Sequence, residues 1–325
     1  MCTAISFKEK SNFFGRNLDL ECSYGEEVII TPRNYGFEYR HSESPMEHMA
    51  IIGIGAVLDG YPLYYDAANE AGLAMAGLNF VGNAKFHTEE QDFYNLSQFE
   101  LIPFILGSCK TVADAKRILL KTRLLGTPFN ESTPPSELHF FITDGKDSLT
   151  AEPMADGFKV YENEIGVLTN NPPYPYHEQN INNYINLTSA VPENRFSDEL
   201  RLVRYSRGMG SIGLPADPSS ASRFVRAAFT KFNAVKKSDK YEELSEVFHV
   251  LESVYQVEGV AKWGDSFEKT QYTSIANLST GEYFYKTYSN SRITAVKLTE
   301  ENKAGETLIR FPLRQREDIL FENGN

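Results

Sequence analysis

Short apolar and alternating runs, separated by turn residues, fill the first eighty residues of the chain. "TAISFK" (3–8) alternates, "SN" makes a turn and "FFGRNLDL" (13–20) returns, which predicts a β-hairpin. The pattern predicts four further strands: "EVIITPRN" (27–34), "MAIIGIGAVL" (49–58), "YPLYYDAAN" (61–69) and "LAMAGLNF" (73–80). Because the second of these four lacks polar alternation, we expect both of its faces to be buried.

Helical spacing of apolar residues begins near residue 96. We expect helices over 96–109 and 111–126, with Thr111 as the N-cap of the second and Gly126 at its end. The turn "STPPSE" then introduces a second set of strands: "LHFFITD", "LTAEPM", "GFKVYE" and "IGVLTNN". Two helices (220–236 and 241–256) precede three closing strands: 270–279, 282–289 and 293–298.

These segments follow one another without an internal repeat or a Pro-, Gly- or Ser-rich linker. The chain has 325 residues, 41% hydrophobic and 13% aromatic, which is enough to bury a large core. Strands and helices in this order predict two sheets with helices outside them, in a single domain over 1–325.

The charge balance restricts the possible partners. The net charge is −12 and no run of lysine or arginine occurs, which argues against nucleic acid and against a stable membrane association. The start of the chain has too short an apolar stretch before Lys8 and Lys10 for a signal peptide. The chain has three cysteines, Cys2, Cys22 and Cys109. A small, odd number of cysteines argues against a disulfide framework and for a reducing compartment, so we expect a cytoplasmic protein.

The sequence offers weak signals for cofactors. Its six histidines are scattered without metal-ligand spacing, and we expect His139 and His249 to pack in the core or on a helix face. "GMGSIG" (208–213) is spelled like a dinucleotide phosphate loop, which would suggest a nucleotide-binding protein. It ends at Pro215 in a polar segment, however, so we interpret it as a flexible loop. The sequence predicts neither metal nor cofactor.

Cys2 directly follows the initiator methionine. If Met1 is removed, one residue carries a thiol and a free α-amine, an arrangement in which the amine can activate its own side chain. The returning strand of the hairpin brings Arg16 and Asp19 beside it: a guanidinium favours a thiolate, and a carboxylate can hold an amine. The alternative is a frayed terminus next to an ordinary surface ion pair on an edge hairpin.

Several motifs resemble the choloylglycine hydrolases, the family of bile salt hydrolases and penicillin V acylases. They are "MCTAISF…FGRNLDLE…ITPRNY", "NEAGLAMAGLNF", "IGVLTNNPPYPYH", "GLPADPSSASRFVRAAF" and "TQYTSIANLSTGEYFYKTY". The resemblance covers essentially the whole chain. It implies an α+β fold with four layers, α-β-β-α, in an N-terminal nucleophile hydrolase that acts on amide bonds after removal of Met1.

The resemblance also implies a set of catalytic residues: Cys2, Arg16, Asp19, Asn79, Asn170 and Arg223. Cys2 matches the nucleophile. Asn79, through its backbone N–H, and Asn170, through its side chain, would supply oxyanion donors. Arg223 would place a fixed charge near the thiolate and an anionic substrate.

The expected substrates are glycine- or taurine-conjugated bile salts, because bile salt hydrolases tend to carry Asn at position 79 where the penicillin acylase branch often has Tyr. Penicillin V and acyl-homoserine lactones are the alternative substrates, and an inactive binding shell is a third possibility. By resemblance the steroid pocket is lined by Leu18, Leu58, Tyr65, Phe129 and Thr133.

The segment 181–217 is long for a connection and rich in apolar residues. We expect it to bury these residues against a symmetry mate. In bile salt hydrolases the corresponding segment reaches a neighbouring subunit, so the resemblance implies a homotetramer.

Overall fold

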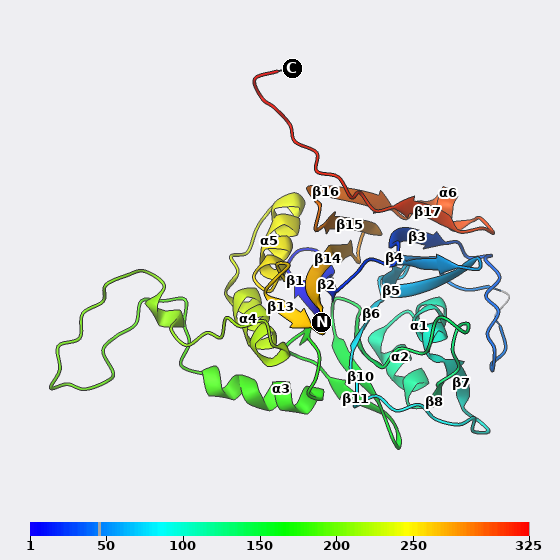
Figure 1. The fold of residues 1–325 in the computed structure, drawn as a ribbon, viewed down its shortest axis with the longest axis horizontal. Coiled ribbons are helices and arrows are strands. Elements are labelled where there is room, and N and C mark those ends of the chain that lie inside the picture. Colours follow the sequence, from blue (N-terminus) through cyan, green and yellow to red (C-terminus); the bar gives the residue numbers. More distant parts are fainter. Residues whose placement is uncertain (45–46, 325) are drawn as a thin grey trace.

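Two β-sheets form the centre of the computed structural model, which describes residues 1–44 and 47–324 (Figure 1). Within these residues the first sheet has seven strands, ordered β12 (Val167–Leu168), β1 (Cys2–Lys8), β2 (Asn12–Leu20), β14 (Ser266–Asn277), β15 (Glu282–Thr287) and β16 (Asn290–Lys297), with β13 (Ala261–Trp263) paired to β14. The second has eight, ordered β11 (Gly157–Glu162), β10 (Ser148–Met154), β9 (Leu138–Thr143), β6 (Ala74–Asn79), β5 (Tyr61–Asn69), β4 (Ile51–Leu58), β3 (Glu27–Thr31) and β17 (Ile309–Pro312).

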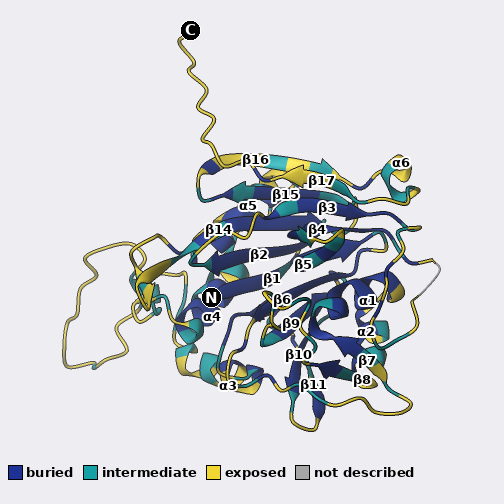
Figure 2. Ribbon diagram, turned by 45° about the vertical axis from the view of Figure 1, so that its right-hand side comes forward, coloured by how far each residue is buried: buried dark blue, intermediate teal, exposed yellow. Residues whose placement is uncertain are grey.

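Helices cover the outer face of each sheet. Helices α4 (Ser220–Asn233) and α5 (Lys240–Glu252) pack on the first sheet, and α1 (Leu101–Ser108) and α2 (Val112–Leu119) pack on the second. Between the sheets, the rings of Phe14 and Phe141 stack with their centroids 6.3 Å apart. Most strands are buried along their length, whereas β13, β16 and β17 are largely exposed (Figure 2). The predicted α-β-β-α architecture is confirmed.

The N-terminal hairpin lies inside the first sheet. In the antiparallel ladder Cys2 is opposite Leu18 and Ala4 is opposite Arg16, while β14 pairs with the other side of β2. A side chain at Gly15 would come within 2.9 Å of Leu251 Cδ1, so glycine lets α5 pack closely on β2. Because the hairpin is covered on both edges and both faces, Arg16 and Asp19 are fully buried. The alternative of a surface ion pair on an edge hairpin is therefore wrong.

The expected helices over 96–109 and 111–126 are wrong at two of their ends. Residues Tyr94–Ser97 form β7 and Thr122–Leu125 form β8, a parallel pair, and α2 ends at Leu119 rather than at Gly126. The backbone of 122–125 pairs with a distant strand, and this tertiary pairing outweighs the local helical spacing. The predicted N-cap is confirmed, since Thr111 Oγ1 accepts from the N–H of Asp114 at 3.2 Å.

Several elements were not predicted from the sequence. They are the helices α3 (Tyr174–Asn180) and α6 (Glu300–Lys303), the strands β13 and β17, and 3₁₀ turns at Gln98–Glu100, Ile181–Tyr184 and Met209–Ser211. Residues 208–213 lie in the last of these turns and neither follow a buried strand nor open an α-helix. The hypothesis of a dinucleotide phosphate loop is therefore wrong.

Two segments extend away from the body. The segment between α3 and α4 projects as an exposed arm, and the residues after β17 form an exposed tail (Figure 2). Within 1–44 and 47–324, no helix combines the length and the apolar character that crossing a membrane requires.

Candidate active site

Cys2 opens strand β1 and is almost completely buried. Its Sγ accepts a hydrogen bond from Arg16 Nη2 at 3.0 Å, and its backbone N–H donates to Asn170 Oδ1 at 2.8 Å. Cys2 and Asn170 lie 168 residues apart in the sequence, and the pairing of β1 with β12 brings them together. Both the sulfur and the nitrogen of residue 2 therefore have fixed partners.

Arg16 is held from several sides. Its Nη1 donates to the carbonyl of Tyr65 at 2.9 Å, and its Nη2 donates to the carbonyl of Gly77 at 3.0 Å as well as to Cys2 Sγ. Burial acts to lower the pKa of Arg16, but the nearby Cys2 sulfur, Tyr272 and Asp66 outweigh it and raise the pKa above its ordinary value. The guanidinium is a permanent cation placed at the sulfur.

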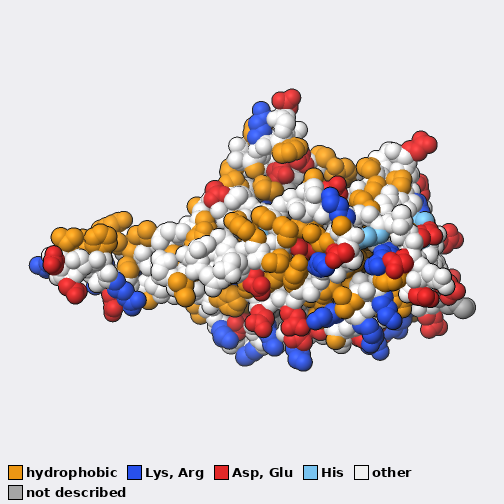
Figure 3. Space-filling view, turned by 90° about the horizontal axis from the view of Figure 1, so that it is seen from below, with side chains coloured by type: hydrophobic (Ala, Val, Ile, Leu, Met, Phe, Trp, Pro, Cys, Tyr) orange, Lys and Arg blue, Asp and Glu red, His pale blue; other side chains and the backbone are white. Residues whose placement is uncertain are grey.

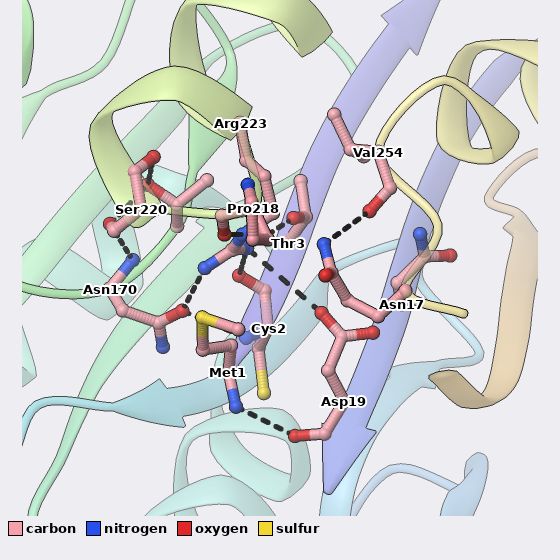
Figure 4. A network of polar contacts seen from close by, with 12 residues as sticks. Met1, Cys2, Thr3, Asn17, Asp19, Asn170, Pro218, Ser220, Arg223 and Val254 are labelled. Atoms are coloured by element: carbon pink, nitrogen blue, oxygen red, sulfur yellow. Dashed lines mark hydrogen bonds and ion pairs between the residues drawn. The ribbon is translucent and has the colours of Figure 1, made fainter. Parts of the chain in front are cut away.

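Asn170 links three parts of the site (Figure 4). Its Oδ1 accepts from Arg223 Nη2 at 2.7 Å in addition to the N–H of Cys2, and its Nδ2 donates to the carbonyl of Asn79 at 2.9 Å. The backbone N–H of Asn170 donates to Ser220 Oγ at 2.8 Å, and the backbone carbonyl of Asn170 accepts from His177 Nε2 at 2.9 Å. Burial lowers the pKa of His177, so the ring is neutral and donates from this nitrogen.

Arg223 lies on α4 and has no exposed surface. Besides Asn170, its guanidinium donates to the carbonyls of Cys2 and Pro218 and to Thr3 Oγ1 (Figure 4). Its donors are thus used on the protein, behind the nucleophile. This placement differs from the expected charge facing an anionic substrate, and it fits a role in holding residue 2 and Asn170.

Met1 continues the ladder beyond Cys2. Its ammonium donates to the carbonyl of Asp19 at 2.7 Å and lies 3.1 Å from Glu268 Oε2, while its own carbonyl accepts from the N–H of Asp19 at 2.9 Å. With Met1 attached, the nitrogen of Cys2 belongs to a peptide bond and is not a base.

The Asp19 carboxylate lies apart from the nitrogen of Cys2. Its Oδ1 accepts from Thr270 Oγ1 at 2.6 Å, and its Oδ2 lies 4.0 Å from Arg223 Nη1. Burial raises the pKa of Asp19 and lowers that of Arg223, because each charged form loses hydration. In this arrangement Asn170, rather than the Asp19 carboxylate, contacts the nitrogen of residue 2.

The five expected pocket residues fall into two groups. Leu18 is buried opposite Cys2, and the half-buried Tyr65 packs on the same hydrophobic cluster. Phe129 and Thr133 share a turn, closed by a hydrogen bond of 3.0 Å from the N–H of Phe129 to the carbonyl of Thr133. The exposed Leu58 pairs in the ladder with Tyr61, whose ring centroid is 5.9 Å from that of Phe129.

A separate cavity of about 780 Å³ lies at the opposite end of β1 from Cys2. Its lining includes Phe7, Lys8, Asp147 and Lys231 but not Cys2, so it does not belong to the candidate site. Across the described part of the chain, no three His, Cys, Asp or Glu side chains are grouped to hold a metal ion.

Comparison with known proteins places this geometry in a family. Residues 2–311 match the model of the linear amide C–N hydrolases of the choloylglycine hydrolase family. The chain belongs to this family. A bile salt hydrolase/transferase of Lactiplantibacillus plantarum is 46% identical over 99% of this chain and 100% of the relative. Another from Bifidobacterium longum is 36% identical over 95% of this chain and 99% of the relative.

Solved structures of the choloylglycine hydrolase fold agree with the architecture. The C2A mutant of the conjugated bile acid hydrolase from Clostridium perfringens superposes with a TM-score of 0.91 at 31% identity, covering 99% of this chain and 100% of that one. A penicillin V acylase from Agrobacterium tumefaciens shares the fold, with a TM-score of 0.74 at 17% identity over 95% of this chain and 90% of that one. As a family member the protein is an amide hydrolase.

Sequence reasoning missed four residues that contact the expected catalytic residues, and a fifth, Glu268, that contacts the ammonium of Met1. The four are Asp66, His177, Ser220 and Thr270. For Asp66 a signal was present, because a carboxylate inside the apolar run "YPLYYDAAN" needs a buried partner. The others carry ordinary polar side chains on α3, α4 and β14, and only the fold brings them to the site.

Proposed function

We propose that the protein hydrolyses the amide bond of glycine- or taurine-conjugated bile salts, with Cys2 as the nucleophile. The observation that carries the proposal is the geometry of residue 2: Sγ is 3.0 Å from Arg16 Nη2, and the nitrogen is 2.8 Å from Asn170 Oδ1. The substrate class is supported by the relatives, which are named bile salt hydrolases and match nearly the full chain.

The proposed reaction starts once Met1 is removed and residue 2 carries a free amine. The amine takes the proton of the thiol, and Sγ attacks the amide carbonyl carbon. The backbone N–H of Asn79 and the side-chain amide of Asn170 stabilise the oxyanion. The protonated amine then gives its proton to the departing nitrogen as the C–N bond breaks. Water attacks the resulting thioester, which releases the bile acid and restores the thiol.

A single measurement tests both maturation and chemistry. Intact-protein mass spectrometry after incubation with taurocholate reports the loss of Met1 and any acyl group on the enzyme. The proposal predicts a chain without methionine that carries a cholyl group removable by water. Parallel assays with glycocholate and penicillin V test the substrate class, and faster turnover of penicillin V would contradict it.

We also propose that the enzyme is a homotetramer of dihedral symmetry. The arm over 181–217 exposes large apolar side chains along its length: Ile185, Val191, Phe196, Leu200, Leu202, Val203, Tyr205 and Ile212. Figure 3 shows orange side chains along this arm. Packing against a symmetry mate would remove this apolar surface from water. In such an assembly the arm would also frame the active site of the neighbouring subunit. Light scattering tests the proposal, and a fully active monomer of 36.7 kDa would contradict it.

Two further assignments belong to the proposal. Residues 1–325 act as one catalytic domain, because both ends of the chain supply strands to both sheets. The location is cytoplasmic, which agrees with three free cysteines, Cys2, Cys22 and Cys109.

A further inference from the structure

A second carboxylate lies behind Arg16, on the side away from the sulfur. Asp66 belongs to β5, has no exposed surface, and places Oδ1 at 3.4 Å from Arg16 Nη1. The proposed reaction uses Arg16 but assigns nothing to Asp66. Arg16 therefore contacts both groups at once, with Nη1 facing the carboxylate and Nη2 facing Sγ.

Three hydroxyl groups bind the Asp66 carboxylate from the opposite sheet. Tyr272 donates to Oδ1 at 2.5 Å, and Ser274 donates to Oδ2 at 2.9 Å. Tyr283 also donates to Oδ2. Tyr272 and Ser274 lie on β14 and Tyr283 lies on β15, so the contacts join the first sheet to the second.

The two tyrosines act as donors. Burial, and after it the negative charge of Asp66, raises the pKa of Tyr272 and of Tyr283 well above the ordinary value. Both phenols therefore keep their protons. A carboxylate accepts about four hydrogen bonds, and neutral hydroxyls fill three of these positions.

Arg16 takes the remaining position at a long distance. The contact of 3.4 Å exceeds the roughly 2.7–2.9 Å usual for a charged N–H on a carboxylate. The contact from Nη2 to the sulfur is shorter, at 3.0 Å. The satisfied carboxylate anchors Arg16 without drawing it away from Cys2.

We propose that Tyr272 and Tyr283 are positioning residues that keep Arg16 on the sulfur of Cys2 by saturating its competitor, Asp66. This inference rests on the proposed role of Cys2 as nucleophile. Removing both phenol hydroxyls leaves two empty positions on a buried carboxylate. Arg16 then closes on Asp66, and the sulfur loses part of the charge that stabilises its thiolate.

The rate at which iodoacetamide alkylates Cys2 at pH 7 reports the position of the Arg16 guanidinium, because the thiolate that this cation stabilises is the reacting species. A Cys22→Ser background removes the exposed thiol, and burial raises the pKa of Cys109 to about 12, which keeps that thiol unreactive. Peptide mass spectrometry assigns the label to residue 2. Alkylation does not depend on turnover, so its result stays readable even if Cys2→Ser retains activity and the proposed function fails.

The double variant Tyr272→Phe/Tyr283→Phe should lower the alkylation rate of Cys2 about tenfold, the effect of losing one charge-assisted hydrogen bond. It should lower kcat with KM unchanged. Tyr64→Phe is the matched control: Tyr64 is a buried tyrosine whose hydroxyl bonds Thr31 Oγ1 at 2.7 Å, away from Asp66, and its removal should leave both quantities unchanged.

Asp66→Asn separates positioning from general damage to the core. It removes the competing charge, so alkylation should be at least as fast as in the parent. Damage to the core would expose the buried thiols and speed labelling of both Cys2 and Cys109, whereas a displaced Arg16 slows labelling at Cys2 alone. Slower alkylation in Asp66→Asn, or an unchanged rate in the double tyrosine variant, would overturn the proposal.

Discussion

Replacing Arg223 by lysine keeps the positive charge but loses the geometry that holds residue 2. The guanidinium serves four acceptors: the carbonyls of Pro218 and Cys2, Thr3 Oγ1 and Asn170 Oδ1. A lysine ammonium has three protons at one point, so it does not reach acceptors on opposite sides of the planar group. We expect it to leave two of these acceptors, in a fully buried place, without a donor.

The expected cost follows from these two bonds. Hydrogen bonds to charged groups contribute roughly 1.5–3 kcal/mol each, so Arg223→Lys should lose roughly 3–6 kcal/mol of unfolding free energy. Domains have about 5–15 kcal/mol in total, so the effect is large. With an m-value of about 3 kcal/mol per M, the urea midpoint should fall by at least about 1 M. Because Asn170 also loses a partner, kcat should fall more than KM rises.

Arg226→Lys provides a matched control on the same helix. Arg226 makes one hydrogen bond, to the carbonyl of Pro215 at 3.2 Å, and is half-buried. Its replacement should shift the urea midpoint by much less than that of Arg223. Equal midpoints for the two variants, with kcat retained in Arg223→Lys, would refute the assignment of Arg223 as the residue that holds the nucleophile.

Three further predictions concern the nucleophile, the buried acid and the pocket. Cys2→Ser should keep the fold and lose nearly all hydrolysis, whereas Cys109→Ser should keep turnover; substantial activity in Cys2→Ser would rule out the mechanism. Since burial raises the pKa of Asp19 in the folded chain, its ionised form destabilises the fold at neutral pH and this penalty disappears as pH falls toward the ordinary carboxyl pKa. The Asp19→Asn variant should therefore unfold at a higher urea concentration than the parent at pH 7, with a smaller difference at pH 4, and it should lose activity. A difference in urea midpoint that grows on acidification would contradict the predicted direction. Arg40 donates to the carbonyls of Pro128 and Phe129, and its guanidinium lies 4.8 Å from the centre of the Phe99 ring. Arg40→Ala should therefore loosen the turn that contains Phe129. In steady-state assays KM should rise about fivefold while kcat stays nearly constant.

The β-rich half of the fold could be predicted from local pattern. The hairpin over residues 2–20 follows from alternation around a short turn, and its strands match the prediction closely. The strand over 122–125 could not be predicted in this way, because "TRLL" fits a helix by spacing and becomes a strand only through its pairing with β7. Four residues carry too little local preference to resist such a partner.

The candidate site also has a part that local sequence predicts and a part that depends on distant contacts. Cys2, Arg16 and Asp19 lie on one hairpin, so the ladder register alone brings them together. The contacts of Asn170 and Arg223 join β1 to a turn and a helix far along the chain, and their meeting with Cys2 came only from resemblance. The hydroxyls around Asp66 depend on the stacking of two sheets, which no single segment of the sequence encodes.

Because Met1 docks in the sheet, its removal, which the proposed function requires, should precede completion of the fold. An aminopeptidase needs a terminus that stands free of the fold, but here the ammonium and the carbonyl of Met1 are both engaged, with Asp19 and Glu268. Asp19 emerges from the ribosome soon after Met1, whereas Glu268 and the strand β14 that closes over the hairpin are synthesised near the end of translation. We therefore expect Met1 to be removed during synthesis, before β14 pairs with the hairpin.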